Sequence, residues 1–187
     1  MELQNKTIFF LGSSVTYGSA AGGVSMADII AETCDCICIK EAVSGTTLAD
    51  LNEKSYVSRL KRAEVTLPID LFVCQLSTND AKRNIPLSDV ERAIREIIDF
   101  VKAHYGCPIV FYTGTRYESE AYVRMIALLY DLQREYSFAV LDLFYDEEMS
   151  SVSEDDYRRY MKDPIHPNLL GYTEWWTPRF VEFFKRM

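Results

Sequence analysis

The sequence predicts an α/β fold in three layers, with a five-stranded parallel sheet between two layers of helices. Short apolar runs alternate along the chain with amphipathic stretches, which is typical of β-α-β units. The strongest runs are apolar at nearly every position, as in a parallel sheet covered on both faces. No internal repeat or low-complexity linker interrupts this pattern, so we expect residues 1–187 to form a single domain.

Five apolar runs are expected to be strands joined by right-handed crossovers. They are residues 7–11, 36–39, 70–76, 108–113 and 138–143. Because the carboxyl ends of parallel strands meet at one edge of a sheet, the loops that follow them form the expected ligand site. These loops are residues 12–19, 42–47, 77–84 and 114–118, together with the segment after the fifth strand.

Helices are predicted between the strands, where apolar residues recur at spacings of three and four. They are residues 25–33, 50–64, 88–104, 119–136, 155–160 and 168–185. Ser88 with Glu91 three residues later is typical of a capping box, which satisfies backbone N–H groups at a helix start. Pro178 is expected to bend or interrupt the last helix, because proline has no N–H to donate.

The composition excludes several classes of function. The formal net charge is -8, which argues against a nucleic-acid partner, since phosphate binding needs a basic surface. No apolar run approaches the ~20 residues of a membrane-spanning helix. The first residues lack the basic leader and cleavage site of a secretory signal. The composition does not indicate an oligomeric state.

The cysteines argue against a metal site. There are five, an odd number, and no CxxC pair occurs. Four of them fall in or directly beside stretches expected to be strands, so we expect buried, reduced thiols and a reducing, cytoplasmic compartment.

Three of the loops after strands carry groups suited to acyl transfer. Ser14 follows the first strand in a tight Gly-Ser turn, which can expose a hydroxyl as a nucleophile. Gly45 can bring its N–H close to a ligand, and Asn79 can aim its amide N–H₂ at a developing oxyanion. Asp80 is expected to organise its loop rather than to act as a base. Each motif alone is weak, because Ser, Gly and Asn are ordinary turn residues.

The segment DPIHPN supplies the base that a serine nucleophile needs. The chain has only two histidines, and His104 is explained by its place near a helix C-terminus. His166 lies between two prolines, which stiffen its backbone. Asp163 lies three residues earlier and can accept a hydrogen bond from the imidazole. Asn168 is the expected cap of the helix that follows.

Taken in order, the segments GSSVTYG, VSGTT, STND and DPIHPN resemble the four signature blocks of the SGNH, or GDSL, hydrolases. The resemblance extends from the first strand to the last helix and implies the flavodoxin-like SGNH fold, with no metal or cofactor. It places Ser14, Asp163 and His166 as the catalytic triad. It places the Ser14 and Gly45 N–H groups and the Asn79 amide as the oxyanion hole.

The chain departs from the family's pattern at two positions. Ser13 stands where the family usually has Asp, so the hydrogen bonding of the first loop must differ. Ser77 stands where the family usually has Gly, and its side chain is expected to narrow the site or to shift the loop.

The resemblance implies a serine esterase that hydrolyses small acylated substrates, with acetylated carbohydrate among the candidates. Tyr17, Arg116 and Tyr117 are predicted to line the substrate cleft. Three alternatives stay open. They are an acylhydrolase of thioesterase or lysophospholipase type, a non-catalytic ligand-binding protein with the same fold, and a flavodoxin-like nucleotide or FMN binder. The last lacks the GxxxxGK pattern of a phosphate-binding loop.

Overall fold

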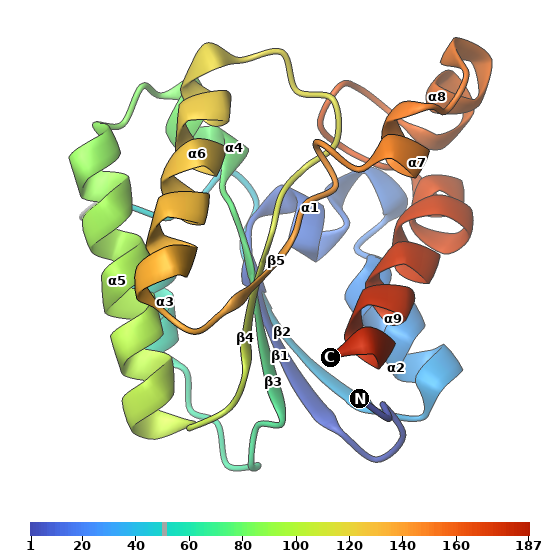
Figure 1. The fold of residues 1–187 in the computed structure, drawn as a ribbon. Helices are drawn as coiled ribbons and strands as arrows, with labels where there is room; N and C mark the ends of the chain where they lie inside the picture. Colours follow the sequence, from blue (N-terminus) through green and yellow to red (C-terminus); the bar gives the residue numbers. More distant parts are fainter. Residues whose placement is uncertain (50–51) are drawn as a thin grey trace.

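Five parallel strands form the centre of the computed structural model, in the order β2-β1-β3-β4-β5 (Figure 1). They are β1 (Thr7–Gly12), β2 (Ile37–Ala42), β3 (Leu71–Gln75), β4 (Ile109–Tyr112) and β5 (Ala139–Leu141). The structure describes residues 1–49 and 52–187. The strand order reverses between β1 and β3, which is the flavodoxin-like arrangement, and the predicted α/β fold is confirmed.

Helices cover both faces of the sheet (Figure 1). One face packs against α3 (Tyr56–Arg62), α5 (Leu87–His104) and α6 (Glu120–Glu135). The other face packs against α2 (Met26–Cys34) and α9 (Thr177–Arg186). Successive side chains of β1 alternate between the two cores, as the pleat of a strand requires. This double burial explains why the strands are apolar at consecutive positions.

Short helical turns complete the chain and correct several predictions. They are α1 (Ser14–Tyr17), η1 (Ser19–Ala21), α4 (Thr78–Lys82), α7 (Glu147–Ser150), α8 (Glu154–Tyr160) and the π-helical turn η2 (Gly171–Trp176). The prediction of loops was wrong at α1 and α4, where serine precedes one turn of helix. In α4 the Ser77 hydroxyl caps the turn by accepting from the Asp80 N–H at 3.4 Å.

Helix boundaries also differ from the predicted ones. The predicted capping box at Ser88 was wrong, because α5 begins at Leu87 after Pro86, and Ser88 already lies inside its first turn. The helix predicted over 50–64 begins at Tyr56, and residues 50–51 lie outside the described residues. The prediction that Pro178 interrupts the last helix was wrong, because Pro178 lies in the first turn of α9 and the backbone stays helical from η2 into α9.

The cysteine thiols are all free, but only Cys74 is fully buried. The prediction of burial was wrong for the other four, which are half-buried. Cys34, Cys36 and Cys38 lie from the end of α2 to the start of β2. β2 is an edge strand, so it pairs with only one neighbouring strand, β1. Within residues 1–49 and 52–187, no helix has the length and apolar character to cross a membrane.

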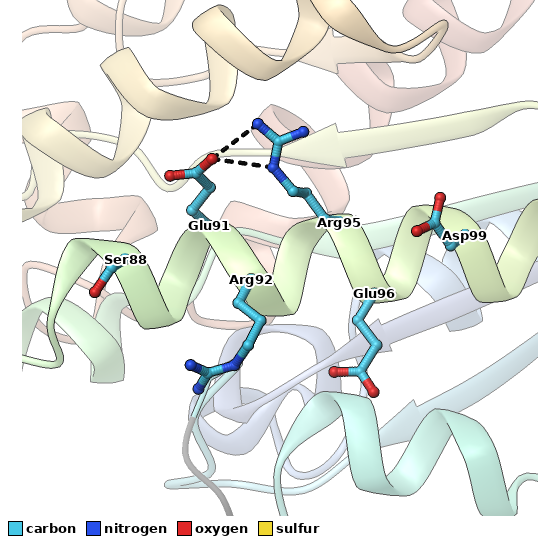
Figure 2. A pocket seen from close by; sticks show the side chains of 6 residues that line it. All are labelled: Ser88, Glu91, Arg92, Arg95, Glu96 and Asp99. Carbon is cyan, nitrogen blue, oxygen red and sulfur yellow. Dashed lines mark hydrogen bonds and ion pairs between the residues drawn. The ribbon is translucent and has the colours of Figure 1, made fainter.

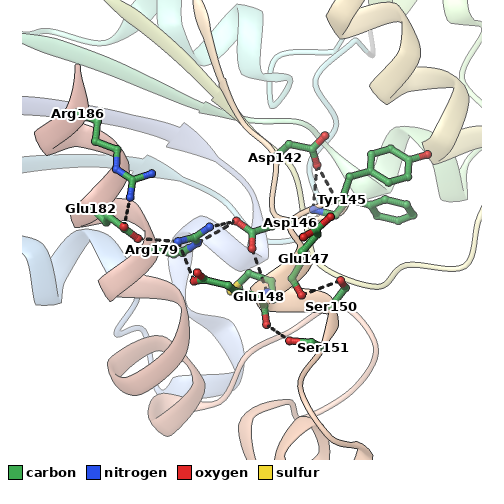
Figure 3. A network of polar contacts seen from close by, with 12 residues as sticks. Asp142, Tyr145, Asp146, Glu147, Glu148, Ser150, Ser151, Arg179, Glu182 and Arg186 are labelled. Atoms are coloured by element: carbon green, nitrogen blue, oxygen red, sulfur yellow. Dashed lines mark hydrogen bonds and ion pairs between the residues drawn. The ribbon is translucent and has the colours of Figure 1, made fainter.

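Polar contacts fix the segment after β5, which leads toward His166 (Figure 3). The Asp142 carboxylate accepts from the Thr113 hydroxyl and from the Phe144 N–H, both at 3.0 Å. Asp146 caps α7 by accepting from the Met149 N–H at 3.1 Å, and Arg179 of α9 donates to it at 2.9 Å. The segment is therefore tied to both β4 and α9.

Candidate active site

Ser14, His166 and Asp163 form a continuous chain of hydrogen bonds. Ser14 Oγ lies 2.8 Å from His166 Nε2. On the other side of the ring, His166 Nδ1 lies 2.9 Å and 2.8 Å from the two Asp163 carboxylate oxygens. With the Nδ1 proton donated to this carboxylate, Nε2 is left as the acceptor for the serine hydroxyl. Ser14 and His166, which are 152 positions apart in the sequence, thus meet in a chain of serine, histidine and aspartate.

The loop that carries the histidine is held by its own backbone. Lys162 N–H donates to the His166 carbonyl at 2.8 Å and closes the loop. Asp163 Oδ1 also accepts from the N–H groups of Ile165 and His166, at 2.8 Å and 2.9 Å. Asn168 Oδ1 accepts from the Gly171 N–H at 3.0 Å and so caps the next helix, as predicted. One carboxylate therefore both folds the loop and orients the imidazole.

These same contacts set the charge of Asp163. Burial by itself would raise the pKa of this carboxyl group, but hydrogen bonds from Ile165 and His166 outweigh it and lower the pKa below its usual value. Asp163 is therefore ionised near neutral pH and stabilises a positive charge on His166.

The turn before Ser14 is closely packed. A Cβ atom on Gly12 would lie 1.7 Å from Thr16 Oγ1 and 2.9 Å from Gln75 Oε1, so only glycine fits there. Gln75 Oε1 accepts from the Ser13 N–H at 2.9 Å. Sequence reasoning missed Gln75, although a polar residue at the end of the otherwise apolar run DLFVCQL was a detectable signal.

Replacing Gly12 by alanine is expected to lower the free energy of unfolding by about 2–3 kcal/mol, because the added methyl group must displace Thr16 or Gln75. Thermal unfolding measures this loss, which corresponds to roughly 4–12 °C in a chain of this size. Gly114→Ala is the matched control, since a Cβ there meets no atom closer than 3.7 Å. Equal melting temperatures for the two variants would contradict this packing.

The second and third loops are bound to each other. Asn79 Nδ2 donates to the Thr46 carbonyl at 2.8 Å, and Arg83 donates to the Gly45 carbonyl at 2.8 Å. Gly45 has φ +76°, a conformation that glycine adopts without strain. Asp80, fully buried, accepts from two consecutive backbone N–H groups at 2.7 Å and 2.9 Å, which confirms that it organises a loop. These bonds hold Gly45 beside Asn79.

Arg59 of α3 is a second organiser that sequence reasoning missed. Its guanidinium is buried and donates to the Gly12 carbonyl at 2.7 Å, to the Glu41 carbonyl at 3.0 Å and to Thr46 Oγ1 at 3.3 Å. It therefore joins the ends of β1 and β2 to the loop that contains Gly45. An arginine in an amphipathic helix gives no signal of this role in the sequence.

Comparison with protein families shows which family this chain belongs to. The model of the GDSL-like lipase/acylhydrolase family matches residues 10–173. The chain belongs to this family. The match runs from β1 to η2 and includes all four segments that meet at the candidate site. No curated protein sequence matches the chain.

Solved structures show the same fold for this GDSL-like protein. A protein from Lactobacillus plantarum superposes with a TM-score of 0.83 at 19% identity, covering 98% of both chains. A member of the lipolytic protein G-D-S-L family from Veillonella parvula gives 0.76 at 15% identity, covering 97% of this chain and 100% of that one. An acetylxylan esterase from Geobacillus stearothermophilus gives 0.73 at 15% identity, covering 97% and 95%. At these identities the likeness shows the fold alone.

The residues predicted to line the cleft have other contacts in this GDSL-like chain. Arg116 donates to the Val152 carbonyl at 2.9 Å and to Glu154 at 2.7 Å, so its guanidinium ties down the segment before α8. Tyr117 packs edge-on against Tyr122, with ring centroids 5.5 Å apart. Tyr17 ends α1 and is 44% exposed, and Lys40 Nζ lies over its ring, 5.6 Å from the centroid. The role of these three residues as substrate contacts stays a prediction.

Surface cavities do not by themselves locate the candidate active site. One of about 520 Å³ runs along the outside of α5 and is lined by charged and polar side chains from that helix (Figure 2). Its Glu91 and Arg95 bind each other at 2.8 Å, and none of its residues comes from the four signature segments. Another hollow, of about 540 Å³, borders Gly45 and Thr46. The hydrogen-bond chemistry of Ser14 therefore locates the candidate site better than cavity size does.

Proposed function

We propose that the protein is a serine esterase that hydrolyses carboxylic esters of small acylated substrates through an acyl-enzyme. The observation that carries the proposal is the 2.8 Å contact between Ser14 Oγ and His166 Nε2, with Asp163 on the far side of the ring. An oriented base within hydrogen-bond reach activates a hydroxyl that is otherwise a weak nucleophile. Membership of the GDSL-like lipase/acylhydrolase family supports the same class of reaction.

In the first step Ser14 Oγ attacks the ester carbonyl while His166 Nε2 takes its proton, and the C–O bond to the alcohol then breaks. His166 returns this proton to the departing alcohol, which leaves the acyl group on Ser14. In the second step His166 removes a proton from water, whose oxygen attacks the acyl-enzyme. The C–O bond to Ser14 then breaks, His166 returns the proton to Ser14 Oγ, and the acid is released. Asp163 stabilises the imidazolium in both steps.

The developing oxyanion is assigned to three donors, the Ser14 and Gly45 N–H groups and the Asn79 amide. Asn79 has two N–H bonds, and one of them binds the Thr46 carbonyl. This bond orients the amide and leaves the second N–H for the oxyanion. Donors fixed in this way stabilise a transition state without having to reorganise.

Replacing Asn79 by alanine is expected to lower kcat by roughly 10²–10³-fold, since one oxyanion donor is lost. Steady-state kinetics on p-nitrophenyl acetate measures the change. Asn84→Ala, a substitution of the same kind at an exposed turn that follows α4, is the control and should leave kcat unchanged. If Asn79→Ala turns over as fast as this control, the amide is not an oxyanion donor.

The acyl and alcohol groups are tested with a panel of acetyl, butyryl and longer esters, together with acetylated sugars and a thioester. Ser14 is half-buried, and the side chain of His166 is 23% exposed, so the nucleophile and its base are open to a small acyl group. We therefore expect the highest kcat/KM on acetyl esters, and we place acetylated carbohydrate first among natural substrates. A preference for long acyl chains or for thioesters favours the lysophospholipase or thioesterase alternative instead.

A further inference from the structure

One side-chain oxygen beneath Ser14 accepts from four donors. Gln75 Oε1 lies 2.9 Å from the Ser13 N–H nitrogen, 2.9 Å from Thr16 Oγ1, 3.3 Å from Ser13 Oγ and 3.4 Å from the Tyr56 hydroxyl. An amide oxygen has two lone pairs, so the two short bonds are the principal ones. They bind the residue immediately before Ser14 and the residue two positions after it.

This group is sealed from solvent. Ser13, Thr16 and Tyr56 are fully buried, and Gln75 is 2% exposed. Because a buried donor without a partner is energetically costly, each of these hydrogen bonds resists displacement. The turn that presents Ser14 is therefore fixed from beneath by the last residue of β3.

A second buried hydroxyl holds the same turn from the neighbouring strand. The Thr16 hydroxyl gives its proton to Gln75, so Tyr112 at the end of β4 donates to Thr16 Oγ1 at 2.6 Å. The Tyr112 ring packs edge-on against Phe180 of α9, with centroids 5.0 Å apart. A chain of hydrogen bonds thus runs from Tyr112 through Thr16 to Gln75, and its first donor, Tyr112, is itself packed in the aromatic core.

One of the two positions that depart from the family's signature belongs to this same group. Ser13 binds Gln75 directly through its N–H and its hydroxyl. The Tyr56 hydroxyl binds the same Gln75 oxygen. A small hydroxyl side chain at position 13 therefore fits against Gln75.

We propose that Gln75 is a positioning residue for Ser14, whose amide oxygen fixes the turn that aims the serine hydroxyl at His166. The inference rests on the proposed function, because it concerns the same nucleophile. Gln75 touches no reacting atom, so its removal disturbs the attack geometry rather than substrate binding. A misplacement of about 1 Å at a reacting group costs up to ~10²-fold in rate.

The test compares Gln75→Met, which removes the acceptor, with Gln75→Glu, which keeps an acceptor oxygen in the same place. We expect Gln75→Met to lower kcat on p-nitrophenyl acetate by about 10- to 100-fold with KM unchanged within about 2-fold. Gln75→Glu should recover most of this loss. The rate at which a fluorophosphonate labels the protein should fall in parallel, because it reports the reactivity of Ser14 itself.

Gln133→Met in α6 is the matched control, since it deletes one partly buried amide hydrogen bond, to the Phe138 carbonyl, at a residue of the outer helix layer. Thr16→Val removes the hydroxyl that donates to Gln75 and accepts from Tyr112, and it keeps the side-chain shape. It serves if Gln75→Met does not fold, and should lower kcat by about 3- to 10-fold. A folded Gln75→Met with the kcat of Gln133→Met overturns the inference, as does a rise in KM at constant kcat. If Ser14→Ala keeps its activity, the proposed function is wrong. If the wild type itself is inactive, both the proposed function and the role of Gln75 are rejected.

Discussion

Replacing Ser14 by alanine is expected to lower kcat on p-nitrophenyl acetate by roughly 10⁴-fold or more, because it removes the hydroxyl that lies 2.8 Å from the His166 ring nitrogen. The substitution removes one half-buried oxygen that hydrogen-bonds to His166, so the fold should stay intact. Steady-state kinetics measures the loss, and thermal unfolding verifies the fold.

Ser19→Ala is the control for this experiment. Ser19 is an exposed serine in η1, five residues along the same segment, and its replacement should leave kcat within about 2-fold of the wild type. A Ser14→Ala enzyme with wild-type turnover would remove Ser14 from the chemistry and leave the observed contact without a catalytic role.

Replacing Asp163 by asparagine is expected to lower kcat by about 10³- to 10⁴-fold. Asparagine keeps an oxygen that accepts from the Ile165 and His166 N–H groups, so the loop remains folded. It cannot supply a negative charge, and its N–H₂ group favours the imidazole tautomer in which Nε2 carries the proton and cannot accept from Ser14. The experiment thus separates the electrostatic role of Asp163 from its structural one.

The pH dependence of activity is a second measurement that tests Asp163→Asn. Hydrogen bonds hold the pKa of Asp163 below its usual value, so the wild-type carboxylate becomes protonated only as the pH falls through that lowered pKa. Wild-type activity should therefore not be limited by Asp163 at neutral pH, whereas Asp163→Asn should be impaired at every pH. Asp155→Asn, at an exposed acid of α8, should behave as the wild type. A variant that regains full activity at high pH would contradict this role.

The sheet was predictable mainly because its central strands β1, β3 and β4 are buried on both faces. A run such as TIFFL contributes Phe9 to one core and Phe10 to the other, and the sequence carries that double burial as consecutive apolar residues. The short turns α1 and α4 were not predictable from periodicity, since four or five residues are too few to show a helical repeat. The turn α1 depends on tertiary contacts of Gln75, whereas α4 begins at the local cap made by Ser77.

Within the candidate site, the sequence was most informative where one short segment contains several residues of distinctive chemistry. DPIHPN places an acid, a histidine and two prolines within six residues, and the structure brings Asp163 and His166 together. Arg59 was not predictable, because its partners are mostly backbone groups distant in the sequence. Gln75 stands out as a polar residue in an apolar run, but its partners in the turn around Ser14 are also distant in the sequence and could not be predicted. Arg116 was predicted as a substrate contact because it follows β4, but its guanidinium instead binds carbonyl groups of the segment before α8.

The reactivity of Ser14 is the central claim, and covalent labelling tests it most directly. The intact protein is treated with a fluorophosphonate, digested, and mapped by mass spectrometry, with the His166→Ala variant treated in parallel. We expect one phosphonyl adduct, on Ser14, that forms far more slowly in His166→Ala, because that variant lacks the base. No adduct in the wild type, or an adduct on another residue at the same rate in both proteins, would contradict a Ser14–His166 nucleophile.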